Sequence, residues 1–236
     1  MVQKLDYPKT ETEFHELRDK MFTHVKDCID NEKSIGFKGI LEVIASETVI
    51  LTAIHKLKGN KGSKTAGVDG NVVNDIIQLP YQEVLSLVRK QLENYRPRQI
   101  RRVYIPKADS EEKRPLGIPT MIDRIIQECV RSVIEPIIEP QFFNHSYGFR
   151  PMRDTHMAME RIKDIVYKTG FHWIVEGDIS KFFDNVNHTI LIKRLWGMGI
   201  RDQRVLMIIK AMLKAGIFNE LKTNHIGTPQ GSLCEA

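Results

Sequence analysis

The 236-residue chain is predicted to fold as an α+β protein that is rich in helices and contains antiparallel hairpins. Apolar residues recur at helical spacing in several segments, most clearly over residues 121–134. Two short strand-like runs, residues 101–107 and 113–118, flank a polar stretch, which is typical of a hairpin. Strands and helices do not alternate regularly, so a parallel α/β sheet is not expected.

The order of the other elements follows from the apolar spacing and from the glycines and prolines between segments. Helices are predicted at residues 10–32, 46–57, 81–94, 121–138, 154–168, 188–196 and 202–215. Pro136 is expected to end or kink the fourth of these helices. A short apolar strand is expected to end at Asp178. The glycine- and lysine-rich segment 59–70 is predicted to be a flexible cationic loop, and it lacks the spacing of a nucleotide-binding P-loop.

Basic residues are concentrated in two places. The net charge of +5 is a mild excess, but nine basic and four acidic residues lie between Arg89 and Arg114. Such clusters favour binding of a polyanion such as RNA, although a solvated charged face is the alternative for either one alone. The residues predicted to contact RNA are Lys56, Lys58, Lys61, Lys64, Arg98, Arg101 and Arg102.

Composition also limits the cellular setting. A hydrophobic content of 42% is that of a globular protein. Three cysteines at wide spacing form neither a disulfide framework nor a zinc motif, which favours a reducing compartment. The most apolar stretch, residues 39–54, is interrupted by Glu42 and Glu47, so no membrane span is expected. A cytoplasmic protein is therefore predicted.

Asp178 is the most informative single residue. It follows an apolar run, and an aromatic residue, Phe183, comes five positions later. A carboxylate at the end of a strand could hold a divalent metal, while the next turn forms one wall of a substrate site. A lone aspartate in this position more often caps a turn, and Asp184 is interpreted as the cap of the following helix.

Three further residues could bind a nucleotide. Lys107 and Arg114 lie on opposite limbs of the predicted hairpin, so both side chains could face one anionic group such as a triphosphate. Two solvated strand ends are the alternative. Gln230 lies between Pro229 and Gly231, where a tight turn would present its amide.

Five sequence blocks, taken in order, resemble the reverse transcriptase domain of bacterial group II intron-encoded proteins, or maturases. The resemblance covers residues 50–232, and the helices before it resemble the N-terminal extension of that family. The blocks are residues 103–107, 113–120, 147–151, 176–179 with 183–185, and 227–231.

The resemblance implies the fingers and part of the palm of a right-hand polymerase. Residues 1–125 would form the N-terminal extension and fingers, and residues 126–236 the start of the palm with a return to the fingers. Its partners would be intron RNA, an RNA template with a DNA primer, and deoxynucleoside triphosphates, and a homodimer is possible. Arg150 belongs to a matching block without an assigned role.

The same resemblance implies specific roles in an RNA-directed DNA polymerase site. Asp178 would be the first catalytic aspartate and, with the carbonyl of Ile179, a ligand of Mg²⁺. Lys107 and Arg114 would hold the triphosphate, Phe183 would exclude a ribose 2′-hydroxyl, and Gln230 would pack on the incoming nucleotide.

The sequence departs from this family at its C-terminal side. The family continues into a hairpin with two adjacent aspartates, whereas this sequence ends at Ala236. Since Asp178 alone would bind Mg²⁺ weakly, the 236-residue fragment is expected to lack polymerase activity. Two other functions remain open: a non-catalytic RNA-binding module that assists splicing, and a reverse transcriptase of a CRISPR-associated or defence system.

Overall fold

The computed structural model describes residues 3–106, 111, 113–218 and 227–228. Lys107 and Gln230 lie outside the described residues. The described elements are β1 (Gln3–Lys4), α1 (Glu11–Asp30), β2 (Phe37–Lys38), α2 (Ile40–Ile44), α3 (Glu47–Gly59), α4 (Val73–Ile77), α5 (Tyr81–Glu93), β3 (Arg101–Pro106), β4 (Lys113–Ile118), α6 (Met121–Ile138), α7 (Thr155–Thr169), α8 (His188–Gly197) and α9 (Gln203–Leu213).

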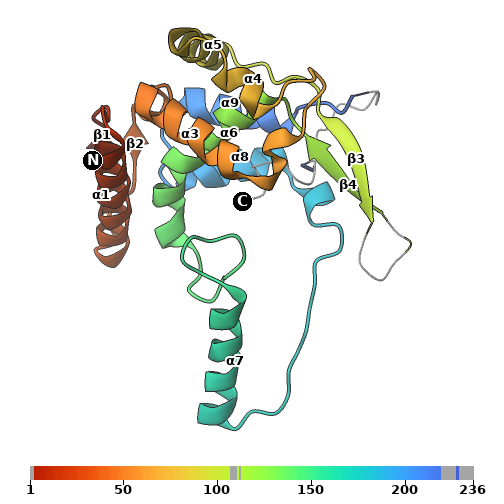
Figure 1. Cartoon of the computed structure of the whole chain (residues 1–236). Coiled ribbons are helices and arrows are strands. Elements are labelled where there is room, and N and C mark those ends of the chain that lie inside the picture. The colour runs from red at the N-terminus through yellow and green to blue at the C-terminus, as the bar shows by residue number, and fades with distance from the viewer. Residues whose placement is uncertain (1–2, 107–110, 112, 219–226, 229–236) are drawn as a thin grey trace.

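Helix α6 is the centre of the helical body (Figure 1). Its apolar residues Ile125, Ile126, Cys129 and Val133 are completely buried, and the helix packs against α1, α2, α3 and α5. The helix continues two residues past Pro136 before a 3₁₀ turn follows. The helix predicted from apolar spacing over this segment is therefore confirmed.

The other predicted helices are confirmed to within a few residues at each end. Two short helices, α2 and α4, were not predicted because five residues give too little periodicity. In the part of the chain that the structure describes, none of the helices has the length and apolarity needed to cross a bilayer.

Short polar side chains begin several of these helices. Thr10 accepts a hydrogen bond from the backbone N–H of Glu13 at the start of α1, and Thr120 accepts one from Asp123 at the start of α6. Such caps satisfy backbone donors that have no partner inside the helix.

The predicted hairpin is also confirmed. Strands β3 and β4 pair antiparallel, with Arg101 opposite Ile118 and Pro106 opposite Lys113. The hairpin projects from one side of the helical body (Figure 1). Its base is held by Ile100, which forms a bridge to Ile217 beyond α9.

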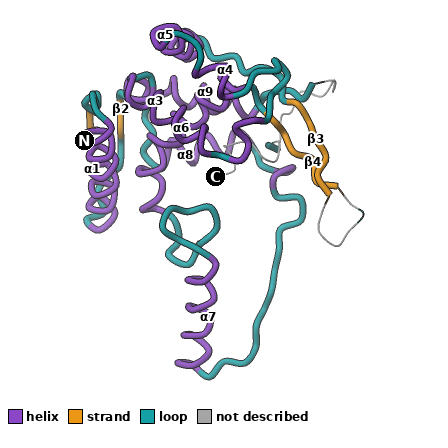
Figure 2. The backbone as a smooth tube through the Cα atoms, in the orientation of Figure 1, coloured by secondary structure: helices purple, strands orange, loops and turns teal. Residues whose placement is uncertain are grey.

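The prediction of a strand that ends at Asp178 is wrong. Residues 170–179 have no regular structure, and α7 buries none of its residues. Figure 2 shows α7 and the following segment extending away from the body. A strand exists only where its backbone groups pair with a neighbouring chain, and none of the described residues pairs with this segment. The apolar residues of the segment are consequently exposed, Trp173 to 94% and Val175 to 97%.

One hydrophobic core joins the two halves of the chain. It contains buried residues from α1, α3, α6 and α9, and α2 packs against α9. The boundary predicted between residues 125 and 126 falls inside α6. The two predicted units therefore share a core in the described structure.

Candidate nucleic-acid interface

Asp178 lies in the exposed segment after α7. Its carboxylate Oδ1 accepts a hydrogen bond from the backbone N–H of Ile179 at 2.8 Å. The described residues contain no group of three or more His, Cys, Asp or Glu side chains that could hold a metal ion. Since Mg²⁺ requires near-octahedral oxygen coordination, Asp178 and the Ile179 carbonyl do not by themselves form a complete magnesium site.

Two of the sequence blocks meet next to Phe183. The backbone N–H of Thr228 donates to the carbonyl of Phe183 at 2.9 Å, and the N–H of Gly227 donates to the carbonyl of Val186 at 2.9 Å. The ring Nε2 of the buried His188 donates to the carbonyl of Gly227 at 2.6 Å. This contact places the half-buried Phe183 next to Thr228, which comes two positions before Gln230 in the sequence.

Gly227 is required for this close approach. Its φ angle is +88°, and a Cβ atom there would lie 2.7 Å from the carbonyl oxygen of Asp184. Only glycine fits this position without displacing backbone. Asp184 itself belongs to a 3₁₀ turn, and the cap of α8 is Asn187, which accepts from the N–H of Ile190 at 3.1 Å. The interpretation of Asp184 as that cap is therefore wrong.

Arg114 lies on the exposed part of β4, opposite Ile105. The register also places Pro106 opposite Lys113, next to Arg114. The two limbs of the hairpin thus approach each other at its outer end. Whether Lys107 faces Arg114 stays a prediction, because Lys107 is outside the described residues.

The lysine-rich segment is held against α6 by hydrogen bonds. The guanidinium of Arg124 donates to the carbonyls of Gly62 at 2.9 Å and Thr65 at 2.8 Å, and also to that of Pro119 at 3.1 Å. Burial and the nearby charge of Arg101 lower the pKa of Arg124. The predicted loop is confirmed as irregular apart from a 3₁₀ turn at residues 61–64, and its flexibility stays a prediction.

The predicted RNA-contacting lysines differ in their surroundings. Lys58, Lys61 and Lys64 are exposed. Lys56 is exposed as well, but its ammonium group donates to the buried carboxylate of Glu128 at 2.9 Å. Sequence alone offered no signal for that pair, because the two residues lie on different helices.

The arginines around the hairpin lie close to the start of α6. The backbone N–H of Arg98 donates to Asp123, which also accepts from the hydroxyls of Tyr95 and Thr120. Burial raises the pKa of Asp123. Arg98 is exposed, and Arg101 and Arg102 on β3 are half-buried.

Arg150 has a structural role that the sequence did not reveal. Its side chain is buried and donates to the carboxylate of Glu139 and to the carbonyls of Phe143 and Ser146, each of the two carbonyls at 2.8 Å. The guanidinium also lies over the ring of Phe142, 5.3 Å from its centroid. Arg150 therefore fixes the loop between α6 and α7.

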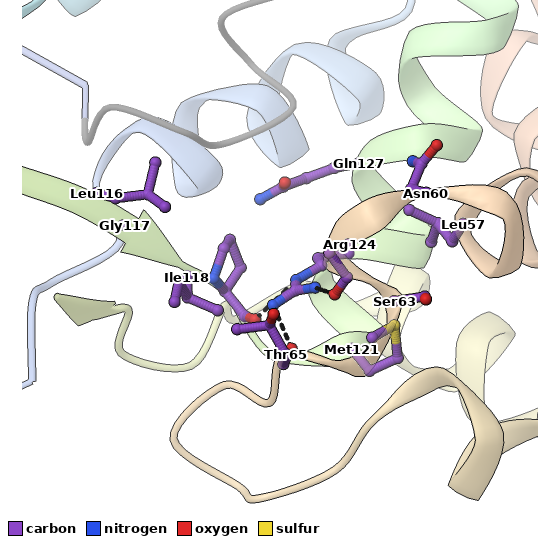
Figure 3. Close-up of a pocket in the computed structure, with 12 residues that line it drawn as sticks. Leu57, Asn60, Ser63, Thr65, Leu116, Gly117, Ile118, Met121, Arg124 and Gln127 are labelled. Carbon is purple, nitrogen blue, oxygen red and sulfur yellow. Dashed lines mark hydrogen bonds between the residues drawn. The ribbon is translucent and has the colours of Figure 1, made fainter. Parts of the chain in front are cut away.

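A cavity of about 230 Å³ lies beside the lysine-rich segment (Figure 3). It is bounded by this segment, the end of β4 and the start of α6. Sequence reasoning missed it, since its walls come from segments more than 50 residues apart. Gln127, which points into it, is one of several polar residues on the buried side of α6, and nothing in the sequence distinguishes it from the others.

The described structure thus combines a hairpin that carries basic residues, a basic segment held against α6, and a contact between two of the sequence blocks. The chain belongs to the reverse transcriptase (RNA-dependent DNA polymerase) family, whose model matches residues 105–234. The resemblance noted in the sequence is thus confirmed.

Relatives with similar sequences include proteins that are named for introns. The group II intron-encoded protein LtrA of Lactococcus lactis subsp. cremoris is 35% identical over 199 residues, covering 84% of this chain and 32% of LtrA. Protein YkfC of Escherichia coli K12 is 34% identical over 86% of this chain and 54% of YkfC. A protein of Arabidopsis thaliana named "Nuclear intron maturase 1, mitochondrial" is 31% identical over 96 residues, which cover 41% of this chain and 13% of that protein. The chain thus spans about a third to a half of the first two relatives.

Proposed function

We propose that this chain supplies the fingers side and the Asp178 carboxylate of an RNA-directed DNA polymerase that acts on group II intron RNA. Membership of the reverse transcriptase family carries the proposal, and the name of LtrA supports the link to group II introns. In the reaction, the 3′-hydroxyl of a DNA primer attacks the α-phosphorus of a deoxynucleoside triphosphate and releases pyrophosphate. An RNA strand serves as template.

The roles of individual residues are part of this proposal. Arg114 and Lys107 would bind the triphosphate by charge-assisted hydrogen bonds. Phe183 would limit the space at the sugar 2′ position, and Gln230 would pack on the nucleotide. The contact of residues 227–228 with the turn at Phe183 supports placing these two side chains in one site.

The magnesium requirement is proposed on the same basis. Asp178 and the Ile179 carbonyl would supply oxygen ligands to Mg²⁺, which would neutralise phosphate charge when bound. The remaining ligands would come from outside the described residues.

Primer extension tests the role of Asp178. Using the protein encoded by the complete reading frame, Asp178→Ala is expected to lower the extension rate at least about a hundredfold, because metal-assisted charge stabilisation contributes several kcal/mol. Asp164→Ala is the matched control, since it removes an exposed carboxylate from α7. Equal extension by Asp178→Ala and the unaltered protein would contradict the proposal.

A second function, RNA binding that assists splicing without chemistry, is favoured by the ordered basic segment. Lys61 and Lys64 are exposed there while Arg124 holds the backbone in place. Such a surface would bind the phosphate backbone of structured RNA largely by shape and charge.

Salt dependence and chelation separate the two functions. Lys61→Ala combined with Lys64→Ala is expected to reduce the slope of log K against log salt by about 1 to 2. Substituting the exposed Lys26 and Lys163 is the control of equal charge. RNA binding should survive EDTA, whereas polymerisation should not. An RNA affinity that is insensitive to salt and to the Lys61 and Lys64 changes would exclude a role of this segment.

A further inference from the structure

The cavity beside the lysine-rich segment has mostly apolar and uncharged walls (Figure 3). Apolar side chains line much of it: Leu57, Leu116, Ile118, Pro119 and Met121. Asn60, Ser63 and Thr65 add uncharged polar groups, and none of the described lining residues is acidic. Cavities of about 300 Å³ or more hold drug-sized ligands, so a volume of about 230 Å³ suits a smaller group.

The side-chain amide of Gln127 lies in this cavity, and its oxygen has no hydrogen-bond partner among the described residues. Its side chain is only 6% exposed and extends into the cavity from α6 (Figure 3). The amide oxygen is buried and receives no hydrogen bond from the described residues. Leaving such a group unpaired destabilises the fold. Rotation about the last side-chain bond exchanges the amide oxygen and nitrogen, so Gln127 can either accept from or donate to a ligand.

Arg124 carries the one charge among the described residues that line the cavity, and the protein holds its guanidinium in place. The guanidinium of Arg124 is already used by the carbonyls of Gly62, Thr65 and Pro119. These three hydrogen bonds hold the guanidinium against the backbone, and the rest of the described lining is neutral and largely apolar, so it favours a neutral group over an ion that would lose its hydration. The ligand group inside the cavity should be neutral.

Further cations lie around the cavity. Lys61 and Lys64 are exposed on the segment that forms one wall. Arg101 lies opposite the lining residue Ile118 in the hairpin, and its buried Nε has no partner among the described residues. A ligand with a neutral polar part and an adjoining phosphate would match this arrangement.

We propose that the cavity binds one unpaired nucleobase, with its edge hydrogen-bonded to the Gln127 amide and its phosphate next to Lys61 and Lys64. Bases splayed out of single-stranded RNA are recognised in this way, by contacts with their faces and hydrogen bonds to their edges. The inference rests on the proposed function, because the base would come from bound RNA. A free nucleotide has the same chemistry and is the other possible source.

The test compares a short single-stranded RNA with an abasic strand of equal length and charge, using the 236-residue chain and the variant Gln127→Leu. The unaltered chain is expected to bind the RNA at least about fivefold more tightly than the abasic strand. Gln127→Leu should bind both strands alike. Since the change also removes an unpaired buried amide, the thermal unfolding midpoint should rise or stay the same.

Two further variants test whether a changed preference for bases results from altered folding. Gln82→Leu removes an exposed amide from α5 and should keep the preference for bases. Leu116→Phe partly fills the cavity from its half-buried wall and should reduce that preference without touching Gln127. Calorimetric titration with adenosine and uridine monophosphates distinguishes a base of bound RNA from a free nucleotide. If the unaltered chain binds these monophosphates and Gln127→Leu does not, the cavity also binds free nucleotides.

The results separate this inference from the proposed function. Two outcomes overturn the base site alone while RNA binding stays salt-dependent. In the first, the unaltered chain binds RNA and the abasic strand equally tightly. In the second, Gln127→Leu leaves the preference for RNA unchanged. Absence of RNA binding by every form overturns both the base site and the RNA-binding role.

Discussion

Segments 59–70 and 170–179 are both largely irregular, yet the first lies against the helical body and the second extends away from it (Figure 2). The first is rich in lysine and glycine, and the second contains the consecutive apolar residues Trp173, Ile174 and Val175. From composition alone, one would expect segment 170–179 to pack against the body and segment 59–70 to extend away from it. The difference lies in partners, because Arg124 and the start of α6 hold the first segment.

Order in an irregular segment depends on fixed groups that satisfy its backbone. Two carbonyls of the first segment are satisfied by one guanidinium, which itself belongs to the best-buried helix of the fold. The second segment has apolar side chains but no described surface on which to bury them. Three substitutions test this contrast and are given in order of decreasing effect on stability.

The largest effect is expected in α6 at Glu128, which holds Lys56 just before the ordered segment. Glu128→Gln should lower the free energy of unfolding at neutral pH by about 3 kcal/mol, because it breaks a buried ion pair. Burial alone would raise the pKa of Glu128, but hydrogen bonds from Arg131 and Lys56 outweigh it and lower the pKa. Urea unfolding of both proteins measures the difference.

The pH dependence of that difference follows from the sign of the shift. A lowered pKa means that the stabilisation is complete above the ordinary carboxyl range and is lost as pH falls through the lowered value. The two proteins should therefore converge below about pH 4. Asp164→Asn on α7 is the exposed control and should leave the urea midpoint unchanged. A difference that persists undiminished in acid would contradict the assigned pair.

The second effect concerns the contact between the ordered segment and α6. A Cβ atom on Gly67 would lie 2.7 Å from the backbone Cα of Thr120, so Gly67→Ala should destabilise the protein by about 1 to 3 kcal/mol. Gly59→Ala is the control, because a Cβ atom there meets nothing within 4 Å. Equal thermal stability of the two variants would show that the segment is free to move away.

The smallest effect is expected in the extended segment. Trp173 is 94% exposed, so Trp173→Ser should change the free energy of unfolding by less than about 0.5 kcal/mol. In a Trp196→Phe background, acrylamide should quench the emission of Trp173 as readily as that of a free indole. Protected emission, or a clear loss of stability, would mean that another surface covers the segment in solution.

Local sequence predicted much of the fold because helices and hairpins depend on nearby residues. The apolar spacing of Ile125, Ile126, Cys129 and Val133 predicted α6, and the polar stretch between two strand-like runs predicted the hairpin. The strand before Asp178 failed because a strand requires a partner that the sequence pattern does not supply.

The candidate site was predictable only in part, for a related reason. The order of the motif blocks indicated the family, and the structure brings Phe183 and Thr228 into contact. No pattern could show that Lys56 pairs with Glu128, that Arg150 fixes a loop, or that Gln127 reaches a cavity. Each of these depends on how distant elements pack.

The amino-acid sequence by itself determined the positions of the helices, the hairpin and the order of the motifs, since periodicity, caps and turn residues act over a few positions. Only the tertiary structure decided which charges are available, which irregular segment is held, and where a cavity forms. These properties arise from contacts between side chains and backbone groups far apart in the chain, whose energies depend on burial and geometry rather than on sequence spacing.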